Sequence, residues 1–308
     1  MGILLGISIF LFYWTITENL EIKTQSRHFY IKPAEIYSKY KLAFVSPFTE
    51  NIKSMNVSRQ LPDFAEVVEN IKNSQGTYSL YIKDLNSESE YVFNEDEKYY
   101  AASLYKIPIG VAALKKIQEG EMSFSDKINF LSVDHVQGTG RISDYSYGTS
   151  FTLEKLLNYL YRDSDNSAQA MILRQIPQPG IYEAFTFYQT KPELNSYYHH
   201  NIATVKDISI YLENILAKDY LNEDYKEKFL SLLYPTSFDN RISSYLDKNL
   251  VFAHKIGSWP GSWHDCGYVY DNNYKNNKIL VCLMNKDTNI NDFNNVCKSI
   301  GIFVSGLF

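Results

Sequence analysis

The order of predicted elements constrains the fold of this chain most, because strand-like segments stand on both sides of a long helical region. Short apolar runs predict the strands, and apolar residues spaced three and four apart predict the helices. We expect strands near Thr77–Asp84, Glu90–Phe93, Leu250–Ile256, Gly267–Tyr270 and Ile279–Asn285, helices near Asp63–Asn73 and Ile290–Val304, and a mainly helical middle up to about Phe238. Strands that are set apart from a block of helices indicate the α+β class.

The chain is long enough for one large core and an amino-terminal appendage. Its 308 residues are 45% hydrophobic, so a domain of about 240 residues can bury a core. We expect this domain at residues 63–308, after a polar spacer at 17–62. Residues 1–16 are almost entirely apolar and uncharged, which predicts a signal anchor or signal peptide; a buried amino-terminal helix is the alternative. The protein is then expected to be exported, either held at the extracytoplasmic face of a bacterial membrane through residues 1–16 or secreted.

Charge and the positions of potential metal ligands argue against two classes of function. The net charge of -5 and the absence of long basic runs argue against a nucleic-acid partner. No cysteine pair has zinc-site spacing, and His199 and His200 are adjacent, so we predict no metal and no other cofactor. Cys266, Cys282 and Cys297 are an odd number, so at least one should be unpaired, and we interpret all three as small buried hydrophobic residues.

Ser103 and Lys106 lie one helical turn apart at the start of an apolar helix. Ile107, Val111 and Leu114 follow at helical spacing, so Ser103 stands at the amino end, where backbone amides and the dipole favour developing negative charge. Burial would lower the pKa of Lys106 towards that of a general base. The spacing therefore predicts a reactive serine. The alternative is an ordinary helix with a serine cap and a surface lysine.

Two further fragments favour the reactive serine. Ser164-Asp165-Asn166 falls on a predicted turn between two apolar helices, where small polar side chains can face a site. His254-Lys255-Ile256-Gly257-Ser258 closes a predicted buried strand, and its glycine would allow a ligand to approach the backbone closely. In this order, S-x-x-K, S-D-N and K-x-G, the chain resembles the penicilloyl-serine family of class A β-lactamases and penicillin-binding proteins over roughly residues 64–305.

The resemblance implies a fold and three catalytic roles. The fold is the α+β, β-lactamase/D,D-peptidase-like one, with an antiparallel sheet from both chain ends, an all-helical lobe and a cleft between them. Ser103 would attack an amide carbonyl and form an acyl-enzyme, and Lys106 would accept the serine proton. Ser164 would carry a proton to the departing nitrogen.

The same resemblance implies the substrate-binding residues. Asn166 would hydrogen-bond the acyl amide, and Lys255 would attract an anionic substrate. Gly257 would let the substrate approach, and the backbone amides of Ser103 and Ser258 would hold the oxyanion. We expect Asp165 only to cap the following helix.

Two departures from the family pattern affect binding and release. Ile256 replaces the threonine of K-T-G, so a hydroxyl for a substrate carboxylate is missing, and Ser258 would point to the other side of a regular strand. In the loop that activates the deacylating water, Lys191 takes the position of the glutamate, Glu193 lies two residues late, and Asn195 matches the asparagine.

The loop therefore leaves deacylation open. Glu193 could serve as the base if the loop is rearranged, with Asn195 beside it. Without a base, the acyl-enzyme would persist, unless Lys106 and Ser164 serve both half-reactions.

Three functions remain in consideration. The first is a serine hydrolase that opens β-lactams or related amides. The second is a D,D-peptidase or transpeptidase-like enzyme that acts on peptidoglycan peptides and releases its acyl group slowly. The third is a non-catalytic penicillin-binding sensor domain, which would have no need of Lys106.

Overall fold

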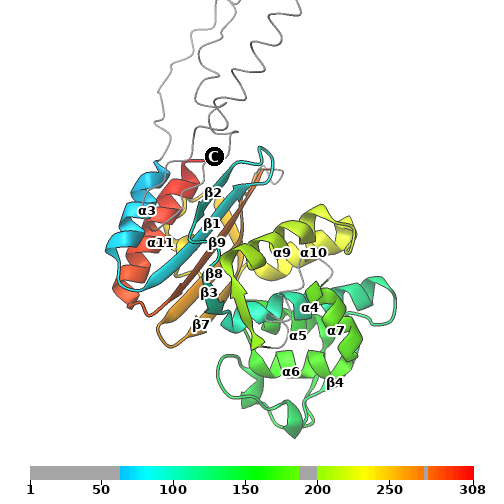
Figure 1. The fold of residues 1–308 in the computed structure, drawn as a ribbon. Helices are drawn as coiled ribbons and strands as arrows, with labels where there is room; N and C mark the ends of the chain where they lie inside the picture. The colour runs from blue at the N-terminus through cyan, green and yellow to red at the C-terminus, as the bar shows by residue number, and fades with distance from the viewer. Residues whose placement is uncertain (1–62, 187–199, 274–276) are drawn as a thin grey trace, which may run out of the picture. The chain divides into compact units, whose positions relative to one another are not determined.

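The computed structural model describes residues 63–186, 200–273 and 277–308. One sheet of five antiparallel strands has the order β2-β1-β9-β8-β7 (Figure 1). The strands are β1 (Thr77–Asp84), β2 (Glu90–Phe93), β7 (Leu250–Trp259), β8 (Ser262–Asp271) and β9 (Lys278–Lys286). Because β1 pairs with β9 along its whole length, from Thr77 opposite Lys286 to Asp84 opposite Ile279, the sheet joins both ends of the domain. The predicted α+β class and the antiparallel sheet are confirmed.

Two helices cover one face of this sheet. They are α3 (Phe64–Asn73), capped by the Asp63 side chain, and α11 (Ile290–Ser305), capped by Asn289. Their apolar sides pack with alternate residues of the strands into one hydrophobic core. In Figure 1 the two helices, blue and red, lie side by side although they come from opposite ends of the domain.

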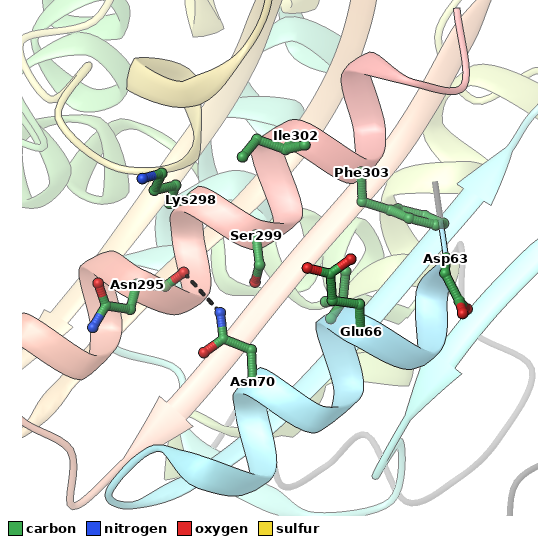
Figure 2. A pocket seen from close by; sticks show the side chains of 9 residues that line it. Asp63, Glu66, Asn70, Asn295, Lys298, Ser299, Ile302 and Phe303 are labelled. Carbon is green, nitrogen blue, oxygen red and sulfur yellow. Dashed lines mark hydrogen bonds between the residues drawn. The ribbon is translucent and has the colours of Figure 1, made fainter. Parts of the chain in front are cut away.

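An open groove of about 380 Å³ runs between α3 and α11. Figure 2 shows its polar rim, where the Asn70 side-chain amide donates to the Asn295 carbonyl at 3.4 Å, and the ring of Phe303 at its floor. The groove is on the side of the sheet that α3 and α11 cover, so the sheet separates it from everything that packs on the other face of the sheet.

The helical lobe packs on that opposite face. It consists of α4 (Lys106–Gln118), α5 (Leu153–Arg162), α6 (Asn166–Gln175), α7 (Gln178–Thr186), α9 (Val205–Ala217) and α10 (Glu223–Leu233), with 3-10 turns η2 (Ala102–Tyr105), η3 (Ser132–Asp134), η4 (Ile142–Asp144) and η6 (Ile242–Tyr245) nearby. The first two turns of α4 are buried all round, as expected of a central helix. Gly110 permits this packing, since a Cβ there would lie 2.2 Å from the Tyr161 hydroxyl.

Two small sheets were not predicted from the sequence. β3 (Lys98–Tyr100) pairs with β6 (Ile202–Thr204), and β4 (Lys127–Asn129) pairs with β5 (Ser150–Thr152). Strands of three residues are too short to show a period of two, so the sequence indicated only the mainly helical character of this region. The β3–β6 pair matters for function because β3 leads directly into the turn that carries Ser103.

The cysteines differ from the expectation. Cys266 and Cys282 stand opposite each other on β8 and β9 and form a disulfide, while Cys297 is free and buried. At least one unpaired cysteine was expected, but the interpretation of all three as plain buried residues was wrong for the bonded pair, because sequence spacing does not reveal cross-strand register.

The amino-terminal predictions fall outside the described residues, both the membrane segment at 1–16 and the spacer at 17–62. Within the ranges that the structure describes, no helix combines the length and the apolar character needed to cross a bilayer.

Candidate active site

The turn between β3 and α4 carries Ser103. Ser103 lies in the 3-10 turn η2, and Lys106 is the first residue of α4. Lys106 Nζ is 3.1 Å from Ser103 Oγ, so the predicted spacing does bring amine and hydroxyl together. Lys106 is only 1% exposed. The alternative of a surface lysine is therefore wrong.

Lys106 Nζ meets four oxygen atoms at hydrogen-bonding distance. Two can only accept, the Ser164 carbonyl at 2.6 Å and Asn166 Oδ1 at 2.7 Å. The other two are hydroxyls, Ser103 Oγ at 3.1 Å and Ser164 Oγ at 3.3 Å. A neutral amine has two hydrogens, which the two acceptors occupy, and its lone pair is then left to face the two serine hydroxyls.

The electrostatic surroundings favour this neutral form. Burial lowers the pKa of Lys106 to about 7, and the negative charge of Asp165 opposes the shift. A base with a pKa near 7 is suited to proton transfer at neutral pH.

The Ser164-Asp165-Asn166 turn joins α5 to α6, as predicted. Asp165 caps α6 by accepting from the Ala168 amide at 2.8 Å, which confirms its structural role. Its other oxygen accepts from the amides of Arg141 and Ile142 at 2.6 and 2.9 Å. These bonds fix the turn at Ser164, which has a left-handed φ of 53°. The Ser164 hydroxyl then lies between Lys106 and Lys255.

The loop Gln137–Arg141 supports this turn and was missed from the sequence. Asn166 donates to the Gln137 carbonyl at 3.0 Å, and the Thr139 hydroxyl donates to the Ser164 carbonyl at 2.9 Å. Gly138 has a positive φ, and a Cβ there would lie 2.7 Å from the Asn166 amide nitrogen. The available signal was the Gly138-Thr139-Gly140 cluster, which marks an unusual loop.

Lys255 reaches the same serine from the edge strand β7. Its Nζ donates to Ser164 Oγ at 2.9 Å and to the Ile256 carbonyl at 2.9 Å. Burial, together with the positive charges of Lys106 and Arg241, lowers the pKa of Lys255 well below its usual value. The site thus gathers two lysines around one hydroxyl and places neutral oxygens against both.

Comparisons with known proteins identify the family of this chain. The sequence model of the beta-lactamase enzyme family matches residues 62–304. The chain belongs to the beta-lactamase enzyme family. The expected enzyme class, a β-lactamase-like serine hydrolase, is thereby confirmed.

Individual relatives are distant in sequence but similar in fold. Beta-lactamase VEB-1 of Pseudomonas aeruginosa is 26% identical over 215 residues, which are 62% of this chain and 70% of the relative. A β-lactamase structure from Sphaerobacter thermophilus has a TM-score of 0.69 at 19% identity and covers 80% of this chain and 99% of its own. A mutant of PBP-A, solved as an acyl-enzyme complex with penicillin G, has a TM-score of 0.67 at 19% identity and covers 78% of this chain and 94% of its own.

Gly257 has a different use from the one expected of it. A Cβ there would lie 2.6 Å from the Ala101 carbonyl oxygen and 3.3 Å from Leu104, so the glycine lets β7 approach the turn that carries Ser103. In the direction of a Cβ atom, the close approach that Gly257 allows is between two parts of the protein. A role of Gly257 towards substrate stays a prediction.

Arg241 is a second residue that the sequence interpretation missed. Its guanidinium is buried and donates to Ser258 Oγ at 2.7 Å and to the Gly257 carbonyl at 3.2 Å. β7 is regular here, with Ser258 opposite Trp263, so Ser258 lies on the same face of the strand as Ile256 and on the other face from Lys255. Through this hydrogen bond from Arg241, the exposed end of β7 lies beside a buried guanidinium.

The deacylation residues proposed from the sequence, Glu193 and Asn195, lie outside the described residues, as does Lys191. Their roles stay predictions. Among the residues that the structure describes, no group of three or more histidine, cysteine or acidic side chains could hold a metal ion.

Proposed function

We propose that this enzyme opens β-lactam rings through an acyl-Ser103 intermediate, with Lys106 as the base. The observation that carries the proposal is the position of Lys106 Nζ, buried and 3.1 Å from Ser103 Oγ, with a pKa lowered to about 7. A lysine in this state accepts a proton from the attacking hydroxyl at neutral pH.

Acylation needs two proton transfers. Neutral Lys106 takes the proton of Ser103 as Oγ bonds to the carbonyl carbon. The resulting ammonium then returns a proton through Ser164, 3.3 Å away, to the ring nitrogen as the carbon–nitrogen bond breaks. The backbone amides of Ser103 and Ser258 hold the oxyanion, a contribution on the order of 3 kcal/mol per donor.

An anionic substrate suits the charges of this site. The lowered pKa of Lys255 reflects burial beside other cations, and a carboxylate that binds near it favours the ammonium form. Arg241 and Ser258 offer a second contact for such a carboxylate and compensate for the hydroxyl that Ile256 lacks.

The second candidate is a D,D-peptidase-like enzyme with slow deacylation. It is favoured by one observation, the lysine at position 191 where a class A enzyme would have its glutamate. Acylation is the same in both candidates, and only the lifetime of the ester differs. We favour hydrolysis, with Glu193, or Lys106 together with Ser164, activating the water.

Intact mass spectrometry over time after mixing with benzylpenicillin tests the proposal. We expect an adduct of one penicilloyl group that disappears as the antibiotic is consumed, and no adduct on Ser103→Ala. Ser299→Ala, on α11, is the matched control and should behave like the wild type. A permanent adduct would favour the slow-release enzyme, and no adduct on the wild-type protein would contradict both.

We also propose that residues 1–16 direct export and leave the enzyme at the extracytoplasmic face or secreted. The support is their apolar, uncharged sequence. Fractionation of bacteria that express the full chain or residues 17–308 tests this. Recovery of both proteins in the cytoplasm would contradict it.

A further inference from the structure

The backbone just before the nucleophile is strained. Ala102, the residue before Ser103, has a φ of 50°, in the left-handed region that residues with a side chain seldom adopt. Such a conformation persists only where the surrounding structure fixes it from several sides. Since the Ala102–Ser103 peptide carries the Ser103 amide, the same contacts set the direction of that amide.

Groups from two distant elements hold this turn. The His264 ring, on β8, donates from Nε2 to the Tyr100 carbonyl at 2.9 Å. Asn201, just before β6, accepts from the Ala101 amide through its own carbonyl at 2.8 Å, and its side chain donates to the Ala102 carbonyl at 3.0 Å. The Ala102–Ser103 peptide group, directly after the strained residue, and the Tyr100–Ala101 peptide group, one residue before it, are therefore bonded to other parts of the chain.

The surroundings of His264 suit two fixed hydrogen bonds of a neutral ring and not proton transfer. It is 0% exposed, and its Nδ1 accepts from the Asn285 backbone amide at 3.2 Å. A carbonyl can only accept and an amide N–H can only donate, so the neutral ring with its hydrogen on Nε2 is the form that satisfies both. Burial lowers the pKa of His264 to about 4, in keeping with a ring that stays neutral.

The ring is itself held in place. Asn285 accepts from the Trp263 amide at 2.9 Å and donates back to the Trp263 carbonyl, which locks β8 to β9 beside the histidine. The Tyr99 ring packs edge-on to the imidazole at 6.0 Å between centroids. His264 thus fixes β3, and the turn η2 that follows it, relative to the five-stranded sheet.

We propose that His264 and Asn201 are positioning residues that hold the left-handed turn at Ala102 and so place the hydroxyl and the backbone amide of Ser103 for acylation. Neither touches substrate in this role. The inference rests on the proposed acyl-Ser103 chemistry and adds which distant side chains that chemistry depends on.

Two isosteric variants separate the contact to Tyr100 from the packing of the ring. Glutamine places an N–H donor near the position of Nε2, whereas asparagine places an acceptor near Nδ1 and leaves the Tyr100 carbonyl without a donor. We expect His264→Asn to slow acylation about 30- to 100-fold, since a displacement near 1 Å can have an effect of this size. His264→Gln should stay within about fivefold of the wild type.

Asn201→Gly supplies an independent test on a less buried residue. Glycine accepts the left-handed backbone of Asn201, at φ 54°, and removes only the side-chain bond to Ala102. We expect acylation to slow about tenfold. Val304→Ala, on the core-facing side of α11, is the control that lowers stability without touching the turn, and its acylation rate should not change.

The readout is the single-turnover rate of penicilloyl adduct formation, with the binding constant and the melting temperature measured on each variant. The proposal is supported if acylation slows in His264→Asn and Asn201→Gly at unchanged binding and is restored in His264→Gln. It is overturned if Asn201→Gly acylates at the wild-type rate, or if the two His264 variants lose equal activity in step with melting temperature. A wild-type protein that forms no adduct would instead contradict the proposed function.

Discussion

His254 and Lys255 are neighbours on β7, yet their side chains lie on opposite faces of the sheet in opposite electrostatic surroundings. Lys255 faces the helical lobe and bonds to a hydroxyl and a carbonyl, beside Lys106. His254 faces α11, with Nδ1 bonded to Asp265 and Nε2 at 3.3 Å from Asp239. Both side chains are buried.

The difference shows in the direction of the pKa shifts. Burial lowers the pKa of Lys255 and of Lys106, and neutral oxygens leave that shift in place. Burial alone would also lower the pKa of His254, but the two carboxylates raise it above its usual value. One face therefore favours the neutral form of its lysines, and the other favours the protonated form of its histidine.

Loss of the base on the lobe side should have the largest effect. Lys106→Met keeps the aliphatic stem and removes the amine, so Ser103 has no proton acceptor. We expect acylation by benzylpenicillin to slow on the order of 10³-fold, within the range of general-base contributions. Intact mass spectrometry over time measures it, with Lys116→Met near the end of α4 as the control. A loss of less than tenfold would show that another group accepts the proton.

Loss of the cation on the opposite side should affect stability instead. His254→Leu leaves Asp265 buried without its ring partner, and we expect the free energy of unfolding at pH 6 to fall by about 3 kcal/mol. Lys228→Met breaks the 2.6 Å ion pair with Glu154, which is partly exposed, and should cost less than about 1 kcal/mol. Urea unfolding measures both. Equal losses would mean that the buried cluster stabilises no more than a surface pair.

The two sides also differed in how well the sequence predicted them. The lobe-side residues Ser103, Lys106, Ser164 and Lys255 were found because each lies in a short local motif. Local spacing fixes the Ser103–Lys106 pair through one helical turn, and the helices and long strands through their periodicity.

The contacts that were missed all join distant segments. Arg241 meets Ser258 across 17 residues, and His264 meets Tyr100 across 164. Their geometry depends on strand order and register, which a single sequence does not reveal. The same limit explains the undetected Cys266–Cys282 bond and the undetected close approach of Gly257 to Ala101.

The pH dependence of acylation tests the lobe side directly. Because Lys106 must be neutral and its pKa is about 7, the acylation rate should rise about tenfold per pH unit below pH 7 and level off above it. Stopped-flow or quenched mass measurements between pH 5.5 and 8.5 give the midpoint. His254→Leu should keep this midpoint, since its cluster lies across the strand. A midpoint near the ordinary lysine value would contradict a buried neutral base.

The pH dependence of the free energy of unfolding is the smallest expected effect. It separates the two sides most clearly, because Lys106 and His254 should change it in opposite directions. Lys106 binds its proton more weakly in the folded protein, so unfolding should become harder as pH rises from about 7 towards the unfolded value of about 10.4. His254 binds its proton more tightly when folded, so its contribution is complete below the unfolded pKa of about 6.5 and is lost as pH rises through the raised folded value.

The stability differences between wild type and each variant should therefore slope in opposite directions, by at most about 1.4 kcal/mol per pH unit. Relative to Lys106→Met, the wild type should gain stability from pH 7 to 9, and relative to His254→Leu its advantage should shrink as pH rises above 6.5. Val304→Ala carries no titrating change and should give a flat difference. Slopes of the same sign would mean that both cations sit in one kind of environment, because the sign depends only on whether folding strengthens or weakens proton binding.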